Sequence, residues 1–164
     1  MARKPRIHFP GALYHVISRG NQRQKVYKDE QEYHRFETLL DEIGKRHSVT
    51  LYAYVLMSNH FYLLLEVSRT PLAKAMQSLL YRYTRYHNQR YRKIGHLFQG
   101  RYKAILCDRD SYLMELIRYL HLNPVRAGMV NDPKRYQWSS HGKYLQGKSD
   151  AGLAVDKGLW LWGG

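Results

Sequence analysis

The chain has 164 residues, 44% of them hydrophobic and 24% charged, which suits one folded domain with a core and is too short for two domains of ordinary size. Its single cysteine, Cys107, excludes a disulfide framework and a cysteine-based zinc site. No stretch is long and apolar enough to predict a secretory signal or a membrane span. We therefore expect a soluble intracellular protein that does not bind membranes.

The formal net charge of +14 is concentrated in two regions without acidic residues, 1–28 and 67–107. Fifteen tyrosines accompany this charge. Lysine and arginine neutralise phosphates and aromatic rings stack on unpaired bases, so the combination favours single-stranded or irregular nucleic acid as the partner. The residues expected to contact DNA are Arg19, Arg23, Arg82, Arg85, Arg90, Arg101 and Lys103.

The hydrophobic patterns predict alternating strands and helices after a basic arm at residues 1–11. Strands are expected at 12–18, 50–57, 60–67 and within 95–106, the last interrupted around Gln99 and Gly100. Helices are expected at 32–46, from 71 toward 92, and from 110 or 111 through 120. The order βαββαβ predicts an α+β, ferredoxin-like fold, an antiparallel sheet with helices on one face and an additional C-terminal helix. We assign residues 1–147 to one domain and leave 148–164 as a tail without predicted structure.

The predicted strand at 60–67 carries polar His60 inside an otherwise apolar stretch. Side chains two residues apart on a strand share a face, so His60 and Tyr62 are expected side by side. This pair has two interpretations: a core histidine packed beside a tyrosine, or two ligands that the sheet presents to a metal ion.

The helix expected after the last strand carries Tyr119, with Asn123 one turn later on the same face. A tyrosine hydroxyl can attack a phosphodiester when a cation polarises the phosphate, and an amide oxygen can add a ligand for that cation. The alternatives are an amphipathic core tyrosine for Tyr119 and, for Asn123 with Pro124, the cap and first turn of a further short helix.

Four separate blocks and a fifth near the end of the chain resemble the single-tyrosine HUH transposases, and within them the REP-associated tyrosine transposases. The blocks are residues 14–21 (YHVISRGN), 55–60 (VLMSNH), 95–101 (GHLFQGR), 118–128 (RYLHLNPVRAG) and 136–140 (YQWSS). The resemblance implies the ferredoxin-like fold, cleavage and rejoining of single-stranded DNA beside hairpins, a 5′-phosphotyrosine intermediate and a divalent metal, Mg or Mn.

By position, the resemblance implies Tyr119 as the nucleophile and His60, Tyr62 and Asn123 as the metal-binding residues. Tyr62 departs from the family pattern, which has a second histidine there. A neutral phenol is a weaker cation ligand than imidazole, so we expect a weakly bound metal and slow cleavage. His15 and His121 are candidates to compensate.

We therefore expect a DNA-cleaving transposase that acts on single-stranded or hairpin DNA in the cytoplasm of a prokaryotic cell, associated with its nucleoid. A homodimer is one option for its assembly. Two alternatives stay open: a protein of the same family that binds hairpin DNA without cutting it, and an RNA-binding sheet that exposes Tyr14, Tyr52, Tyr54 and Phe61 for stacking.

Overall fold

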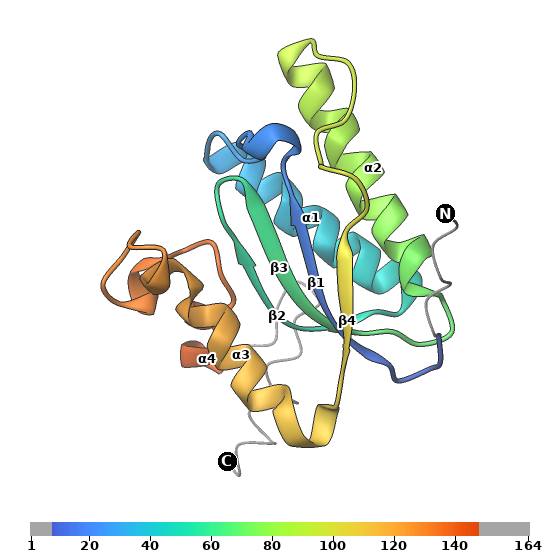
Figure 1. Cartoon of the computed structure of the whole chain (residues 1–164), viewed down its shortest axis with the longest axis vertical. Helices are drawn as coiled ribbons and strands as arrows, with labels where there is room; N and C mark the ends of the chain where they lie inside the picture. Colours follow the sequence, from blue (N-terminus) through green and yellow to red (C-terminus); the bar gives the residue numbers. More distant parts are fainter. Residues whose placement is uncertain (1–7, 148–164) are drawn as a thin grey trace.

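The computed structural model describes residues 8–147, apart from the side chains of residues 109–111. A four-stranded antiparallel sheet in the order β2-β3-β1-β4 is formed by β1 (Leu13–Arg19), β2 (Thr50–Leu56), β3 (His60–Glu66) and β4 (Lys103–Cys107). The helices are α1 (Glu30–His47), α2 (Leu72–Tyr91), α3 (Arg109–Arg126) and α4 (His141–Gln146) (Figure 1). The start of the basic arm and the C-terminal tail lie outside the described residues. Within residues 8–147, no helix is both long and apolar enough to cross a membrane.

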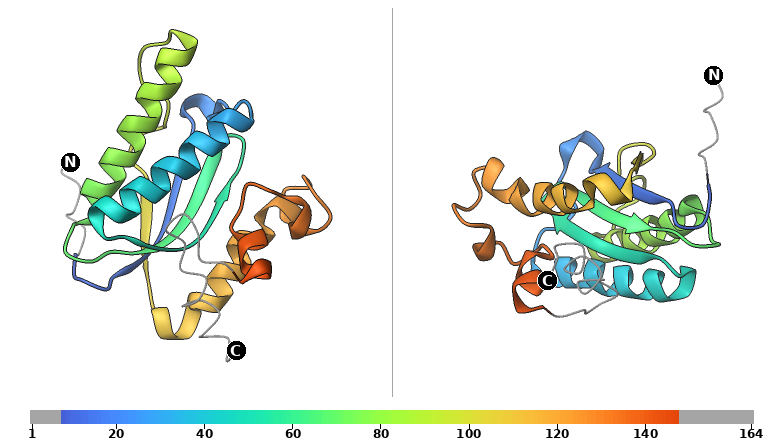
Figure 2. Two further views of the ribbon diagram at one scale, coloured as in Figure 1. Left: turned by 180° about the vertical axis from the view of Figure 1, so that it is seen from behind. Right: turned by 90° about the horizontal axis from the view of Figure 1, so that it is seen from below.

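The sheet separates two helical layers, with α1 and α2 on one face and α3 on the other (Figure 2). Alternation along β3 sends Phe61 toward α1 and α2, where its ring lies 4.9 Å from that of Phe36. Tyr83 of α2 joins them, 5.2 Å from Phe36. His60 and Tyr62 take the opposite parity and face α3. The predicted ferredoxin-like order, with an extra C-terminal helix, is confirmed.

A buried carboxylate joins the start of α1 to the end of α2. Asp29 caps α1 by accepting the Glu32 N–H at 3.1 Å, so the helix begins two residues before the predicted start. Glu32 is fully buried and accepts the Lys28 N–H, a guanidinium N–H of Arg90 at 2.6 Å and the Tyr91 hydroxyl. A buried charge is tolerated only when it is satisfied in this way.

The strand predicted within 95–106 is confirmed as Lys103–Cys107, after the expected interruption around Gln99 and Gly100, whereas the residues before the interruption form a loop. Gly95 and Gly100 have positive φ angles of 102° and 57°, which interrupt extended pairing. The loop is instead fastened to the end of β1, where Gln99 N–H bonds to Arg19 O at 2.8 Å. Phe98 is buried, 5.8 Å from the Phe61 ring. The apolar residues of this loop therefore close the core.

Helix α3 runs without a break past Pro124, so the expectation that Asn123 and Pro124 begin a further helix is wrong. Proline at this position removes only the amide that would bond to the Leu120 carbonyl, and the next turn re-forms with Ala127 N–H bonded to Asn123 O at 2.9 Å. Tyr119 and Asn123 thus share one rigid helix with Arg126.

The segment 136–140 covers the outer edge of β2. Leu56 N–H bonds to Trp138 O at 2.8 Å and Ser140 N–H bonds to Tyr54 O at 3.0 Å. The Trp138 ring stacks on Tyr33 of α1 at 4.5 Å. An exposed strand edge invites pairing with other chains, so this block has a structural role.

A buried histidine on α3 makes stability depend on pH. His121 lies against the Ser140 hydroxyl at 2.6 Å, and burial, followed by the charge of His141, lowers its pKa to about 3. Below pH 6.5 the unfolded chain therefore binds more protons than the folded one, and we expect the free energy of unfolding to fall as pH drops from 6.5 toward 4, by up to ~1.4 kcal/mol per pH unit from this residue.

Urea unfolding at pH 7, 6 and 5 checks this expectation. The His121→Gln variant, whose amide can still reach Ser140, should show a shallower pH dependence than the natural chain. Equal slopes for the two proteins would contradict the assignment of the effect to His121.

Candidate active site

The site is built where β1, β3 and α3 meet. In the antiparallel ladder Arg19 lies opposite His60 and Ile17 opposite Tyr62, so all four side chains share the face that α3 crosses. Helix α3 places Tyr119 over the same face, with its ring edge-on to that of His15 at 6.1 Å. The predicted nucleophile and the predicted strand residues are therefore neighbours in space.

Four aromatic side chains form a continuous row across this face. The His60 ring lies edge-on to Tyr62 at 5.2 Å, Tyr62 stacks on His15 at 5.6 Å, and His15 contacts Tyr119. Tyr62 is thus enclosed between two imidazoles. We name His60, Tyr62, His15 and Tyr119 the aromatic row.

The ring of His60 is held in one tautomer by its neighbour in sequence. Its Nδ1 lies 2.6 Å from the Asn59 amide oxygen, which can only accept, so the proton resides on Nδ1 and the lone pair on Nε2. Burial, and then the charge of Arg19, lower the pKa of His60 and keep the ring neutral at neutral pH. His60 therefore suits a cation ligand. This role of Asn59 was not predicted from sequence, and its position directly before His60 is the one sequence feature that could have indicated it.

Tyr62 is a poor cation ligand in this setting. Burial, and then the nearby Tyr119, raise the pKa of its phenol above the usual value, although the charges of Arg19 and Arg126 oppose that shift. The hydroxyl is therefore neutral at physiological pH, and a neutral phenol offers a single weak oxygen donor.

Asn123 uses part of its amide within its own helix. The amide nitrogen donates to the backbone oxygen of Tyr119 at 3.3 Å, which leaves the amide oxygen as its only ligand atom. In the part of the chain that the structure describes, no three His, Cys, Asp or Glu side chains come close enough together to hold a metal ion. The residues of this face thus fit a divalent ion poorly, with His60 the best donor.

The two histidines considered as substitutes differ. His121 points to the far side of α3, toward Ser140 and His141, and does not reach the aromatic row. His15 belongs to the row, is nine-tenths buried, and its Nε2 has no hydrogen-bond partner among the described residues. His87 in the core also has ring nitrogens without a partner among the described residues, so this feature alone does not assign a function to His15.

The residues predicted to bind DNA divide into two groups. Arg19, Arg101 and Lys103 line one cleft of about 480 Å³ beside the aromatic row, together with Ile17, Ser18, Gln99 and Gly100. We name this the basic cleft. No carboxylate lines it, so its charges are available to phosphates. Arg23 and Arg85 are exposed outside it, on the turn after β1 and on α2.

Arg82 and Arg90 face α1 instead. Arg82 forms an ion pair with Glu42 at 2.7 Å, and Arg90 forms ion pairs with Asp29 at 2.5 Å and Glu32 at 2.6 Å. These guanidinium groups join two helices on the opposite face of the sheet. The contribution to DNA binding expected of them from sequence has no support from their surroundings.

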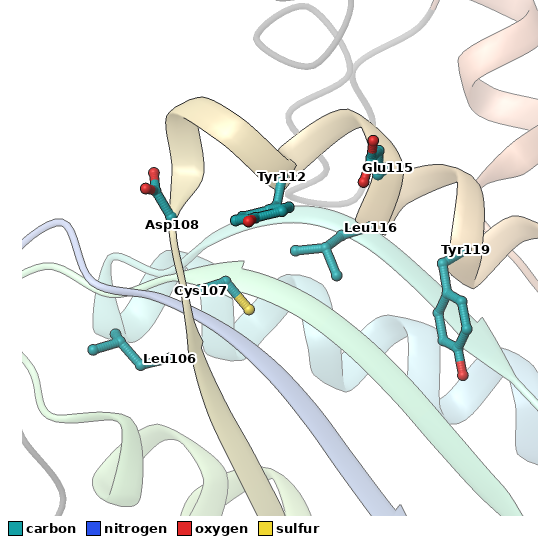
Figure 3. Close-up of a pocket in the computed structure, with 7 residues that line it drawn as sticks. All are labelled: Leu106, Cys107, Asp108, Tyr112, Glu115, Leu116 and Tyr119. Carbon is teal, nitrogen blue, oxygen red and sulfur yellow. The ribbon is translucent and has the colours of Figure 1, made fainter.

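An apolar cavity of about 460 Å³ opens between β4 and α3, with Tyr119 at one end (Figure 3). Leu106 and Cys107 of β4 form one wall, and Tyr112 and Leu116 of α3 form the other. The sequence did not indicate this cavity, because it depends on the angle at which α3 leaves β4.

Comparison with known proteins identifies the family to which the chain belongs. The family model described as Transposase IS200 like matches residues 9–123. The chain belongs to the IS200-like transposases. Its fold is similar to that of a REP-associated tyrosine transposase bound to a REP hairpin, with a TM-score of 0.76 and 12% identity, covering 95% of this chain and 90% of that one. A proposed transposase from Deinococcus radiodurans R1 gives a TM-score of 0.49 at 20% identity, covering 72% of this chain and 94% of that chain. No curated protein sequence matches the chain.

The family match spans the strands of the aromatic row and ends at Asn123. The resemblance to transposases is therefore confirmed for the family and the fold. At 12% identity the structural likeness speaks for the fold alone, and the roles of individual residues in this transposase stay predictions.

Replacing the phenol at position 62 should improve metal binding. Tyr62→His would place an imidazole between His15 and His60, and adjacent imidazoles bind Mn²⁺ more tightly than the two that a phenol separates in the natural protein. We expect an increase in manganese affinity of at least about tenfold, because removing even a supporting partner of a metal site costs roughly 10–100-fold. Calorimetric titration with Mn²⁺ measures it, with Tyr62→Phe as the matched control. Equal affinity of Tyr62→His and the natural protein would show that another residue already supplies the ligand.

Proposed function

We propose that this IS200-like transposase cleaves and rejoins single-stranded DNA beside hairpins, with Tyr119 as the nucleophile. The observation that carries the proposal is the position of the Tyr119 side chain, 43% exposed on α3 and in contact with the sheet face that bears His60 and Tyr62. The similar fold of a transposase bound to a REP hairpin supports a hairpin-bearing strand as the substrate.

In the cleavage step the Tyr119 hydroxyl oxygen attacks the phosphorus of a phosphodiester. The bond between Oη and phosphorus forms while the bond from phosphorus to the 3′ oxygen breaks, and the phenol proton is balanced by protonation of the departing 3′ oxygen. The products are a 5′-phosphotyrosine and a free 3′-hydroxyl. No co-reactant is consumed, so attack by a 3′-hydroxyl on the phosphotyrosine reverses the step and rejoins a strand.

The surroundings of Tyr119 suit a single strand. The basic cleft near the aromatic row offers three cations to phosphates. The cavity that Tyr119 lines offers the Tyr112 ring and aliphatic side chains to an unpaired base, and Asp108 and Glu115 also line it. Phosphate neutralisation combined with stacking is how proteins hold single strands. The proposal places the protein at the nucleoid, in the cytoplasm.

The second candidate function is binding of hairpin DNA without cleavage. The neutral Tyr62 phenol favours it, since a divalent ion, Mg or Mn, would be held weakly and mainly through His60. Cleavage in this chain is accordingly expected to be slow.

The structure does not support the alternative of an RNA-binding sheet. The four aromatic residues expected to form its stacking surface are all buried in the core rather than exposed. They are Tyr14, Tyr52, Tyr54 and Phe61. A platform for bases requires exposed rings on the sheet.

Removing one hydroxyl tests the nucleophile. Tyr119→Phe should abolish a covalent protein–DNA adduct while leaving folding and DNA affinity nearly unchanged, because the ring and its contacts remain. The adduct is measured by incubating labelled hairpin-bearing single strands with the protein and Mn²⁺ and separating the products on a denaturing gel. Tyr112→Phe, two turns earlier on α3, is the matched control. An adduct that survives in Tyr119→Phe and disappears in Tyr112→Phe would move the nucleophile to Tyr112.

The salt dependence of binding tests the basic cleft. For single strands the slope of log affinity against log salt is roughly −0.7 per neutralised phosphate. Arg101→Gln combined with Lys103→Gln should therefore make the slope shallower by about 1.4. Arg82→Gln should leave it nearly unchanged, because Arg82 already pairs with Glu42. Fluorescence anisotropy with a labelled single strand measures both. A larger loss in Arg82→Gln than in the double variant would place the strand on the α1–α2 face.

A further inference from the structure

Two guanidinium groups reach the aromatic row from different elements. Arg19, at the end of β1, lies opposite His60 and is close enough to the Tyr62 hydroxyl to hydrogen-bond with it. Arg126, in the last turn of α3, lies over the Tyr119 ring with its central carbon 4.2 Å from the ring centre. Its Nη1 also donates to the Tyr119 backbone oxygen at 3.3 Å, which holds the group against the tyrosine.

Neither group forms an ion pair with a carboxylate in the described part of the chain, whereas Arg82 and Arg90 on the other face both do. Arginine carries five N–H donors in a planar fork that matches two oxygens of a phosphate. The contacts of Arg126 with Tyr119 use one donor and the face of the guanidinium, so donors on its edge remain for a ligand.

We propose that Arg19 and Arg126, here named the arginine clamp, bind the phosphate group that Tyr119 attacks. This inference rests on the proposed function of Tyr119 and extends it by naming what holds the phosphate. A phosphate bound to the edge of Arg126 lies next to the tyrosine on which that arginine stacks, and Arg19 reaches the same place from the His60 side of the row.

The clamp explains how a site with a poor donor set for metals can hold a phosphodiester. Guanidinium groups stay charged at all physiological pH values and need no cofactor to neutralise phosphate oxygens. The charges of Arg19 and Arg126 both lower the Tyr62 pKa, which is consistent with both groups lying near that hydroxyl. Phosphate binding at the row should therefore persist when divalent ions are removed.

The test uses the full chain and a small probe, thymidine 3′,5′-bisphosphate, titrated in the presence of EDTA and followed by calorimetry and by NMR shifts. Arg19→Gln and Arg126→Gln should each weaken binding of the probe about tenfold or more, because each removes a charge-assisted hydrogen bond. Arg118→Gln removes one exposed charge from the same helix and should change affinity less than twofold. Arg126→Lys keeps the charge but loses the planar pair of N–H donors, so its affinity for the probe should lie between that of Arg126→Gln and that of the natural protein.

Each outcome decides the proposal. Unchanged binding in Arg19→Gln and Arg126→Gln, a loss equal to that in Arg118→Gln, or no binding of the probe to the natural protein at millimolar concentration would overturn the clamp. The covalent adduct assay with Tyr119→Phe distinguishes a failure of the arginine clamp from a failure of the proposed nuclease function. Probe binding that depends on both arginines without any adduct leaves the clamp standing and rejects the nuclease, and an adduct with binding indifferent to both arginines does the reverse.

Discussion

The pairing of β1 with β3 in the centre of the sheet is the constraint on which the rest of the structure depends. Seven residue pairs run in register from Leu13 opposite Glu66 to Arg19 opposite His60. This register sends Val16 and Phe61 into the core under α1 and α2, and the aromatic row to the other face. A slip of one residue in this register would exchange the two faces of the sheet. Core packing against α1 and α2 therefore fixes the geometry of the face that bears the aromatic row.

The position of the proposed nucleophile, Tyr119, depends on contacts far away in the chain. Tyr119 is positioned by α3, whose inward residues Ile117 and Leu120 are buried against the sheet, and by the segment 136–140, which pairs with β2 and receives His121. Because α3 continues through Pro124, Arg126 is placed by the same rigid body as the tyrosine it covers. Positioning on a helix rather than a loop gives a reacting group a defined location.

Local periodicity accounts for what could be predicted from sequence. Period two on a strand puts His60 beside Tyr62, and the four-residue spacing puts Asn123 one turn after Tyr119; both relations hold in the structure. Long-range choices could not be predicted. Arg90 and Arg19 both stand in basic segments, yet Arg90 forms an ion pair with a buried carboxylate 58 residues away, whereas Arg19 forms none with the carboxylates that the structure describes. The interruption before β4 could be predicted from Gln99 and Gly100, but the loop at Leu97 and Phe98 could not, because these apolar side chains are buried in the core without belonging to a strand.

The contrast between arginines that pair with carboxylates and the two arginines at the aromatic row also bears on the chemistry of the site. A divalent ion concentrates two charges at one point, whereas a guanidinium spreads a single charge over a planar group, so two arginines grip a phosphate firmly but stabilise a departing oxygen less strongly. A site with His60 as its best-placed imidazole, a neutral phenol at position 62 and two arginines without ion pairs to the described carboxylates is therefore expected to hold a phosphate more readily than it breaks the ester bond. The arrangement around the proposed nucleophile Tyr119 therefore suits binding of a DNA phosphate better than rapid cleavage.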